Sequence, residues 1–264
     1  MRNLIYILLL LPFLVLGQTI PDKKYHAGTE ISKTYHGGVE VWSAGSAFPL
    51  DDPDFVVSFY AEDLGADESA VATWPDRIGS NDATQGTGAN QPKVNVEGDG
   101  KKAVDFDGTN DGLSITEVAA LNFTPGNPIS LVVVTGEKAW GADQMALFKG
   151  NTSSSVTGLE YGFYASGIDQ LRGNTYGANG TYGTKTASNV DVWIVTSDGT
   201  NSELFKNGVS AATWIAGTAD ISSDIWIGAR LGGSKFFSGS IRAVGIANTL
   251  LDASQLTAIN SYGW

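Results

Sequence analysis

Short apolar runs separated by turn residues fill the chain from about residue 54 to its end. The stronger runs lie at 55–60, 102–106, 129–135, 145–150, 160–165, 190–196, 225–230 and 238–247. Runs of this length, bounded by Gly, Asn, Asp and Ser, are typical of β-strands. Asn207-Gly208 stands between two further β-prone runs and predicts a type I′ hairpin, because both turn residues need positive φ. Many strands with so little helix predict an antiparallel sandwich or jelly roll.

One helix is predicted near the end of the chain, in "LLDASQLTAINSYG". Asp252 can cap the free N–H groups, and Gln255 follows at the spacing of a capping box. Leu251 and Leu256 occupy the two staple positions, and Gly263 can close the helix. The chain therefore ends in a short helix packed on a sheet.

Residues 23–42 repeat a ten-residue pattern that contains both histidines, "YHAGTEI" followed by "YHGGVEV". Ala27-Gly28 and Gly37-Gly38 are two-residue turn signals. They predict a ribbon of three strands at about 24–26, 29–36 and 39–42. In this ribbon His26 faces Thr29 and His36 faces Val39.

The two histidines cannot share a metal ion within one chain. Thr29 and His36 lie seven residues apart, which places them on opposite faces and about 23 Å apart along a strand. The repeat is therefore architectural, and a metal bridge between chains is the poorer alternative. Neither face of the ribbon is cleanly apolar, so it should pack on the main domain or on copies of itself. We expect a homo-oligomer formed through residues 23–42.

The N-terminus has the layout of a secretory signal peptide. Arg2 precedes an apolar run at 4–16, and Gly17-Gln18 is a small-residue cleavage point. The alternative is a retained hydrophobic anchor. A helix over 4–16 would span only about 20 Å of the roughly 30 Å of bilayer hydrocarbon, which disfavours a full membrane crossing. The expected organisation is a signal peptide or anchor at 1–17, the ribbon at 23–42, a linker at 43–53 and the main domain at 54–264. The expected location is extracellular or at the cell surface, with a virion as the alternative.

Composition excludes several classes of function. The chain has 264 residues, with 16 Lys and Arg against 28 Asp and Glu, and a formal net charge of −12. So acidic a chain lacks the electrostatic footprint of a nucleic-acid partner. It has no cysteine, which excludes disulfides and thiolate metal sites.

A cluster of carboxylates in "DFDGTNDG" offers oxygen ligands of the kind that calcium prefers. The candidate ligands are Asp105, Asp107 and Asp111. Asp and Asn before Gly are also ordinary turn residues. The turn is the leading interpretation, and calcium is the one cofactor that stays open.

A Gly-, Asn- and Thr-rich segment at 169–188 contains the similar units "GNTYG" and "NGTYG". Their Tyr176 and Tyr182, together with Arg172 and the loop residue Trp140, form a candidate ligand-binding patch, since aromatic rings stack on sugars and loops carry binding sites. The alternative is a plain surface hairpin.

Catalysis is not expected. Glycosidases need two carboxylates facing one cleft, and no E-x-D-x-E string occurs in the chain. Residues 54–264 contain no histidine, which excludes a histidine base. The acidic pairs at 62–63 and 67–68 read as solvated loops. The sequence therefore predicts a protein that is not an enzyme.

Several motifs resemble those of laminin G-like, concanavalin A-like jelly rolls. "FKNGV", "IWIGAR" and "FFSGSIRAVGIANTLLDASQLTAINSYG" are similar to the C-terminal half of such domains, and "VVSFYAED", "WPDRIGSNDATQ" and "AVDFDGTNDGLSI" to the N-terminal half. The resemblance covers residues 54–264 and implies an all-β antiparallel sandwich with one short C-terminal helix. It also implies glycan or protein binding, although some relatives are glycoside hydrolases or lyases. The repeat at 23–42 resembles segments of phage tail and virion proteins.

The resemblance and the candidate patch together lead to a functional hypothesis. We expect a non-catalytic surface-recognition protein that binds a glycan or cell-surface polysaccharide. It would serve adhesion, either exported or carried on a phage virion as a spike or fibre. The alternative is a structural subunit of a virion or surface assembly, and a glycoside hydrolase is a distant third.

Overall fold

The computed structural model describes the backbone of residues 24–26, 29–31, 33–36, 39–43, 161–167, 170–175 and 178–184, and residues 48–138, 144–149, 189–218, 223–230 and 235–264 in more detail. The chain divides into two compact units, Met1–Ala47 and Phe48–Trp264. Among the described residues, no helix has the length and apolar character needed to cross a membrane.

The N-terminal unit contains two antiparallel hairpins. They are formed by β1 (Lys24–His26) with β2 (Thr29–Ile31), and by β3 (Lys33–His36) with β4 (Val39–Ser43). His26 pairs with Thr29 and His36 with Val39, which confirms the predicted registers. The prediction of one strand over 29–36 is wrong, because each half of it pairs only within its own hairpin.

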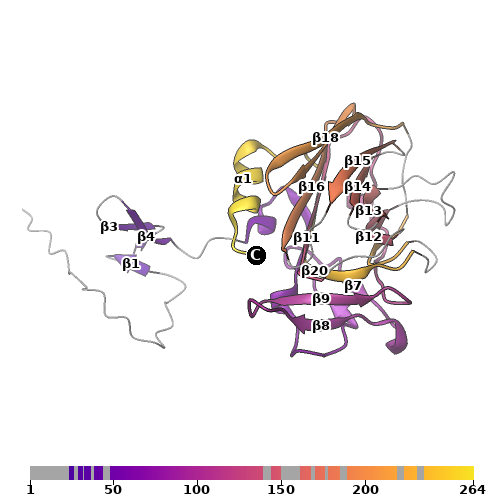
Figure 1. Cartoon of the computed structure of the whole chain (residues 1–264). Coiled ribbons are helices and arrows are strands. Elements are labelled where there is room, and N and C mark those ends of the chain that lie inside the picture. The colour runs from indigo at the N-terminus through magenta and orange to yellow at the C-terminus, as the bar shows by residue number, and fades with distance from the viewer. Residues whose placement is uncertain are drawn as a thin grey trace, which may run out of the picture. The chain divides into compact units, whose positions relative to one another are not determined.

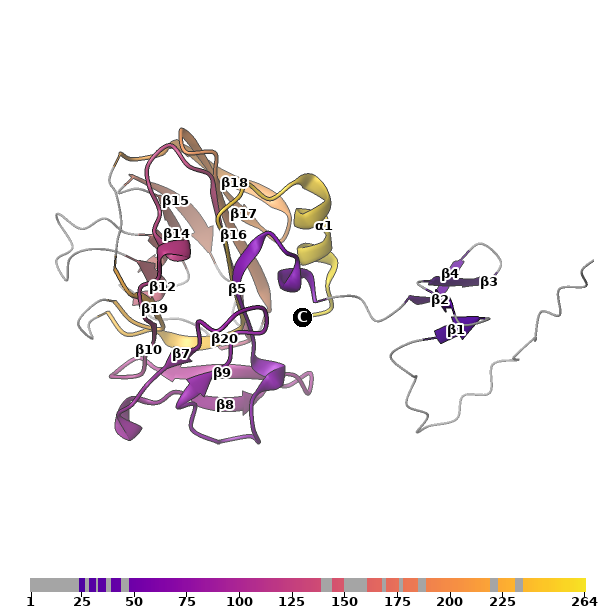
Figure 2. The same cartoon turned by 180° about the vertical axis from the view of Figure 1, so that it is seen from behind.

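The main unit is a sandwich of two antiparallel sheets (Figures 1 and 2). The first sheet has the order β18 (Val209–Ile215), β17 (Asn201–Lys206), β16 (Asp191–Ser197), β11 (Ile129–Thr135), β20 (Ser238–Ala247), β9 (Lys102–Asp107) and β8 (Lys93–Val96), and β5 (Phe55–Tyr60) also pairs with β20. The second has the order β15 (Ala178–Thr184), β14 (Gln170–Thr175), β13 (Tyr161–Gly167), β12 (Gln144–Lys149), β19 (Ile225–Ile227), β10 (Leu113–Ile115), β7 (Ala83–Thr84) and β6 (Thr73–Trp74). This confirms an all-β antiparallel fold.

The first sheet is covered on both faces, which explains its continuous apolar runs. All seven residues of β11 are buried. Leu131 and Val133 belong to the core between the two sheets, whereas Val132 and Val134 belong to a second cluster that includes Ile259 of α1 (Ala253–Ser261). The helix therefore adds a third layer over the outer face of this sheet (Figure 1).

The helix α1 begins as predicted and ends differently. The capping box is present, because Asp252 accepts from the backbone N–H of Gln255 and the Gln255 side chain accepts from the N–H of Asp252. At the other end the helix closes at Tyr262 with an extended backbone. Gly263 does not have the positive φ of a helix-ending glycine, so that prediction is wrong. The chain instead turns away with two aromatic residues, Tyr262 and Trp264.

The turn between β17 and β18 is the one that the sequence predicts. Asn207 and Gly208 have φ values of 49° and 77°, as a type I′ turn requires. The Asn207 side chain also accepts from the N–H of Val192 at 2.8 Å and donates to the Asp191 carboxylate at 2.8 Å. The turn is thereby fastened to β16.

In the part of the chain that the structure describes, four single-turn 3-10 helices lie between the strands. They are η1 (Pro49–Asp51), η2 (Ala61–Asp63), η3 (Gly88–Asn90) and η4 (Ala119–Leu121). Of these, η1 and η2 flank β5 at its two ends. They place Phe48 and Glu62 beside the segment that follows α1, where the candidate site lies.

Candidate functional site

Four aromatic rings from distant parts of the main unit gather into one cluster. Phe48 precedes η1, Tyr60 ends β5, and Tyr262 and Trp264 follow α1. Tyr60 stacks on Trp264 with ring centroids 5.7 Å apart, and Phe48 meets Tyr60 edge-on at 4.5 Å. Tyr262 packs edge-on against Trp264 at 4.7 Å and lies 5.8 Å from Phe48. Such offset and edge-on pairs stabilise an aromatic cluster beyond its buried area.

Hydrogen bonds fix the rings in place. The Tyr60 hydroxyl accepts from the N–H of Leu50 at 2.8 Å, and burial raises the pKa of its phenol. The indole N–H of Trp264 donates to the carbonyl of Ile259 at 2.7 Å, which holds the last residues against α1. The side-chain amide of Gln255 donates to the Asp54 carboxylate at 2.8 Å, which ties the start of α1 to the residue before β5.

Arg77 supports the cluster from one side. Its guanidinium lies 3.9 Å from the centroid of the Phe48 ring and 5.1 Å from that of Tyr60. It also pairs with the carboxylates of Asp51 at 3.0 Å and Asp63 at 2.7 Å. Since both partners belong to the helices that flank β5, Arg77 is a structural cation rather than one available to a ligand.

The cluster forms one wall of a hollow of about 230 Å³, which we call the aromatic hollow. Its lining consists of the four rings and of Glu62, Lys101, Lys102, Arg242 and Gly263. Phe48, Tyr262 and Trp264 are half-buried, so their rings remain partly accessible. Ring faces with a few polar groups at the rim are characteristic of small-molecule sites.

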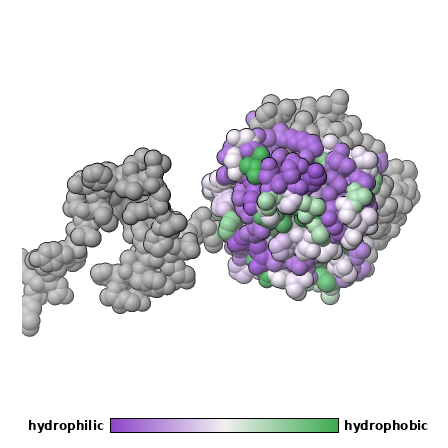
Figure 3. All heavy atoms as spheres, turned by 90° about the horizontal axis from the view of Figure 1, so that it is seen from below, coloured by the Kyte–Doolittle hydropathy of each residue, from purple (hydrophilic) through white to green (hydrophobic). Residues whose placement is uncertain are grey.

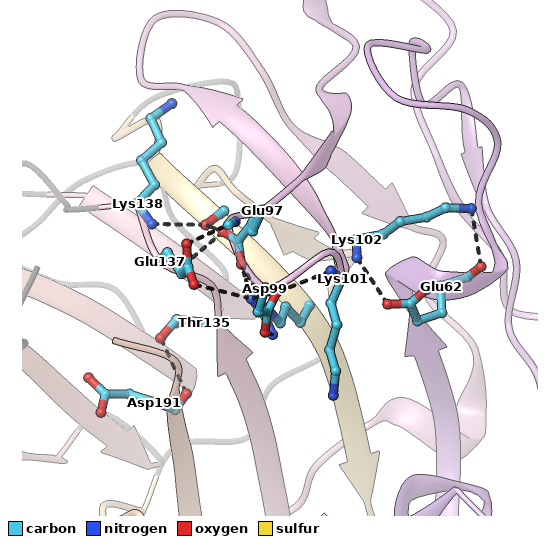
Figure 4. A network of polar contacts seen from close by, with 12 residues as sticks. Glu62, Glu97, Asp99, Lys101, Lys102, Thr135, Glu137, Lys138 and Asp191 are labelled. Atoms are coloured by element: carbon cyan, nitrogen blue, oxygen red, sulfur yellow. Dashed lines mark hydrogen bonds and ion pairs between the residues drawn. The ribbon is translucent and has the colours of Figure 1, made fainter. Parts of the chain in front are cut away.

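A buried ion-pair network supports the rim of the hollow. Arg242 is held by Glu97 at 2.5 Å and by Asp99 at 2.7 Å, and its side chain is 3% exposed. Glu97 also accepts from the Ser240 hydroxyl at 2.6 Å and from the N–H of Glu137 at 2.7 Å. Figure 4 shows Glu97 and Asp99, which follow β8, close to Glu137, which follows β11. Hydrogen bonding from Arg242 lowers the pKa of Asp99.

The two lysines of the hollow differ in their contacts. The Lys102 ammonium donates to the carbonyl of Leu64 at 2.7 Å, and its backbone N–H donates to Glu62 at 2.9 Å. The backbone N–H of Lys101 donates to the Asp99 carboxylate at 3.0 Å. Its side chain extends away from the carboxylates in Figure 4, and a Cβ added to Gly263 would stand 3.7 Å from its ammonium nitrogen.

The predicted calcium ligands lie in a separate polar hollow of about 400 Å³. Asp107 accepts from the backbone N–H groups of Thr109 at 2.7 Å and Asn110 at 3.1 Å, and Asp111 accepts from the N–H of Asp107 at 2.9 Å. Burial raises the pKa of Asp111. Burial also acts on Asp107, but its backbone hydrogen bonds outweigh it and lower the pKa of that carboxyl.

A lysine contacts this acidic group directly. The Lys138 ammonium pairs with Asp105 at 2.6 Å and donates to the carbonyl of Phe106 at 3.1 Å. Within the described part of the chain, no cluster of three or more His, Asp or Glu side chains could hold a metal ion. Asp107 and Asp111 accept hydrogen bonds from backbone N–H groups of the turn, and Asp105 forms an ion pair with Lys138.

The predicted tyrosine patch lies only in part within the described residues. Trp140 and Tyr176 fall outside them, and the side chains of Arg172 and Tyr182 are not described. The segment expected as a rim loop forms the neighbouring strands β14 and β15, in which Arg172 pairs with Thr181. The backbone therefore agrees with the surface hairpin that the sequence left open as the alternative.

A third hollow, of about 580 Å³, lies where β16, β17 and β18 meet Leu250. It is lined by Thr196, Asp198, Asn201, Ser202, Glu203, Thr213, Trp214, Ile215 and Leu250. Only one aromatic ring lines it. On the face shown in Figure 3, apolar residues are scattered among hydrophilic ones rather than joined in one patch.

Comparison with known proteins identifies the fold and no family. No protein-family model matches the chain, and no curated protein is similar to it in sequence. Among solved structures, Trypanosoma rangeli sialidase in complex with 2,3-difluorosialic acid has a TM-score of 0.59 at 16% identity, over 87% of this chain. The chain spans only 36% of the sialidase.

Two further solved structures show a similar likeness. Domain 4 of AbnA, a GH43 extracellular arabinanase from Geobacillus stearothermophilus solved with arabinotriose, has a TM-score of 0.55 at 14% identity, over 78% of this chain and 98% of that domain. The binding domain of botulinum neurotoxin DC in complex with SialylT has a TM-score of 0.51 at 11% identity, over 80% of this chain and 52% of that one. At such identities the likeness shows the fold alone, a β-sandwich.

These likenesses correct one prediction. The sequence led us to expect a protein that is not an enzyme, and that prediction is wrong as it stands. The structures that share the fold include sialidases and a domain of a glycoside hydrolase. The lack of an E-x-D-x-E string in the sequence excludes only one arrangement of catalytic carboxylates.

Proposed function

We propose that the main unit binds saccharides through the aromatic hollow. The observation that carries the proposal is the cluster of four rings, of which Phe48, Tyr262 and Trp264 are partly accessible. The C–H face of a sugar packs on an aromatic ring, while hydroxyl groups need donors and acceptors at its edge. The hollow offers both kinds of contact.

The polar groups at the rim suit hydroxyl recognition. The carboxylate of Glu62 is exposed and can accept hydrogen bonds. Burial raises the pKa of the Tyr262 phenol, so this hydroxyl stays protonated and can donate. The indole N–H of Trp264 is already used by Ile259, and we assign the Trp264 ring to stacking alone.

The fold likenesses support this proposal. Domain 4 of the arabinanase was solved with arabinotriose, and the neurotoxin binding domain with SialylT. We further propose that the protein acts outside the cell, after removal of residues 1–17, as an adhesion or receptor-binding component of a cell surface or phage virion. Several copies joined through residues 23–42 would raise the avidity of weak single sites.

The β14–β15 hairpin is a second proposed contact with saccharide. It carries Arg172 and Tyr182, and Tyr176 lies between its strands in the sequence. We retain these residues and Trp140 as ligand-binding candidates. The hairpin lies at the edge of the second sheet, whereas the aromatic hollow is built around the first, so the two sites can be tested separately.

Glycoside hydrolysis is the second candidate function, and the polar hollow favours it. Glycosidases use one carboxyl of raised pKa as acid and one that stays ionised. Burial raises the pKa of Asp111, while backbone hydrogen bonds lower that of Asp107. We expect Asp111→Asn to abolish any release of reducing sugar from polysaccharides. Turnover that survives this change would place the chemistry elsewhere.

Saccharide binding is tested by calorimetry and glycan arrays on Tyr262→Ala. A loss of binding at an unchanged melting temperature supports the aromatic hollow. Trp214→Ala is the matched control, because this half-buried ring lines a different hollow. Affinity should be low, about −4 to −8 kcal/mol. If the wild type binds no glycan on a broad array, a structural role in a surface assembly becomes the leading explanation.

A further inference from the structure

The ammonium group of Lys101 stands out among the cations of the aromatic hollow. The structure shows no hydrogen bond or ion pair between it and any described residue, whereas Arg242 is held by two carboxylates and Lys102 by a backbone carbonyl. Lys101 is also half-buried. Charged groups that leave water are normally paired. A half-buried cation beside aromatic rings is therefore open to pairing with an anionic ligand.

The charge of the hollow departs from that of the chain. The whole protein has 28 acidic against 16 basic residues. The side chains that line the hollow include three basic groups and one carboxylate, that of Glu62. The acidic groups behind it, Glu97 and Asp99, are committed to Arg242. A negative charge entering the hollow would therefore meet the Lys101 ammonium as its nearest uncommitted partner.

The size of the hollow limits the ligand. Its volume of about 230 Å³ is below the roughly 300–1,000 Å³ of sites for drug-sized molecules. One sugar ring fits this space better than a longer oligosaccharide buried along its length. A ring stacked on Tyr262 or Trp264 would turn its edge toward Lys101, whose ammonium lies close to Gly263 between these two residues.

We infer that the hollow selects a sugar that carries a carboxylate, with the carboxylate bound by Lys101. This inference rests on the proposed saccharide binding and adds the chemical class of the ligand. The ammonium and the carboxylate would form a charge-assisted hydrogen bond, which is stronger than one between neutral groups. Glu62, on the same rim, would accept from hydroxyl groups of the same ring.

The experiment compares each acidic probe with its methyl ester, which removes the charge and keeps the ring. The probes are trigalacturonate and 3′-sialyllactose, measured by calorimetry against the full chain. We expect the acid to bind at least about tenfold more tightly than the ester. Lys101→Met should remove this difference, and Lys101→Arg should restore part of it. Raising the salt concentration should weaken only the acid.

Lys93→Met is the matched control. Lys93 lies on β8, in the same hairpin, and forms only an exposed pair with Glu68 at 3.2 Å. The variant loses the same charge and should bind both probes as the wild type does. Equal binding of acid and ester, or an unchanged preference in Lys101→Met, would overturn the inference while leaving saccharide binding intact. Failure of the wild type to bind any saccharide would overturn both.

Discussion

Replacing the buried Lys149 by methionine should stabilise the protein at neutral pH. Lys149 ends β12 with its side chain 2% exposed. Its ammonium donates to the carbonyl of Ser223 and lies 5.6 Å from the centroid of the Phe123 ring. Burial lowers the pKa of Lys149 from 10.5 to about 8, against the opposing effects of Glu117 and Asp224. At neutral pH the amine therefore stays charged in the folded protein, at a cost in stability relative to the unfolded chain.

The sign of the pH dependence follows from this lowered pKa. Below pH 8 the lysine is protonated in both the folded and the unfolded state, and the cost of burying its charge is fully present. Between about pH 8 and 10.5 the folded state has lost the proton and the unfolded state keeps it, so stability rises with pH. The full gain is about 3 kcal/mol, of which about 2 kcal/mol falls between pH 7 and 9.5.

Lys149→Met removes the charge and fills a similar volume. At pH 7 we expect a net stabilisation of about 1–2 kcal/mol, because the relief of the buried charge is offset by the Ser223 carbonyl left without its donor. The rise in stability between pH 7 and 9.5 should disappear. Ionisation of tyrosines in the unfolded chain affects both proteins alike, so it cancels in the comparison.

The assay is urea unfolding at pH 7 and at pH 9.5, with the wild type and Lys149→Met measured side by side. Lys93→Met serves as the control, since an exposed lysine should change neither stability nor its pH dependence. Parallel pH profiles of wild type and Lys149→Met would refute the reasoning. So would a variant that is less stable at pH 7, because the ammonium would then be a net stabilising donor.

Four further predictions concern other parts of the chain. Gly136→Ala should lower the free energy of unfolding in urea by about 3 kcal/mol, because its Cβ would collide with Glu97 and Ser240 and disturb a buried ion pair. A decrease below about 1 kcal/mol would contradict this. Thermal melts with calcium and with chelator should coincide, because Lys138 and backbone N–H groups occupy the carboxylates of "DFDGTNDG"; a gain of about 2.7 kcal/mol at a hundredfold excess over Kd would instead show calcium binding. Light scattering should give an oligomeric mass for the full chain and a monomeric mass for residues 48–264, and monomeric masses for both would exclude oligomerisation through residues 23–42. Intact-mass measurement on native material should show loss of residues 1–17, and a mass that includes Met1 would favour a retained anchor.

Local patterns predict those parts of the fold that local interactions determine. The continuous apolar run of β11 and the capping box of Asp252 and Gln255 depend on residues a few positions apart, and both are found as predicted. Asn207-Gly208 is a similar case, since positive φ is a property of the residues themselves. In contrast, the composition of the segment around Arg172 left a binding loop and a surface hairpin both open. Backbone pairing with a neighbouring strand requires no apolar side chain, so composition alone could not decide in favour of β14 and β15.

The candidate site could not be predicted in the same way. The aromatic hollow joins Phe48, Lys101 and Trp264, which are brought together only by the complete fold. The sequence signal for this site was the pair of aromatic residues directly after the helix. The sequence analysis considered only the glycine between them, Gly263, as the residue that ends the helix. The pairing of Arg242 with Glu97 spans 145 residues of sequence. No periodicity or spacing rule reports contacts of this range.

The position of β20 in the first sheet has a consequence for folding on the ribosome. This strand, one of the last to be synthesised, pairs with β11 on one side and with both β5 and β9 on the other. The early strands must therefore wait for residues 238–247 before their sheet can close, and long-range pairing of this kind is slow. Until then the nascent chain exposes the apolar strand β11, and exposed apolar strands of this kind are prone to aggregation.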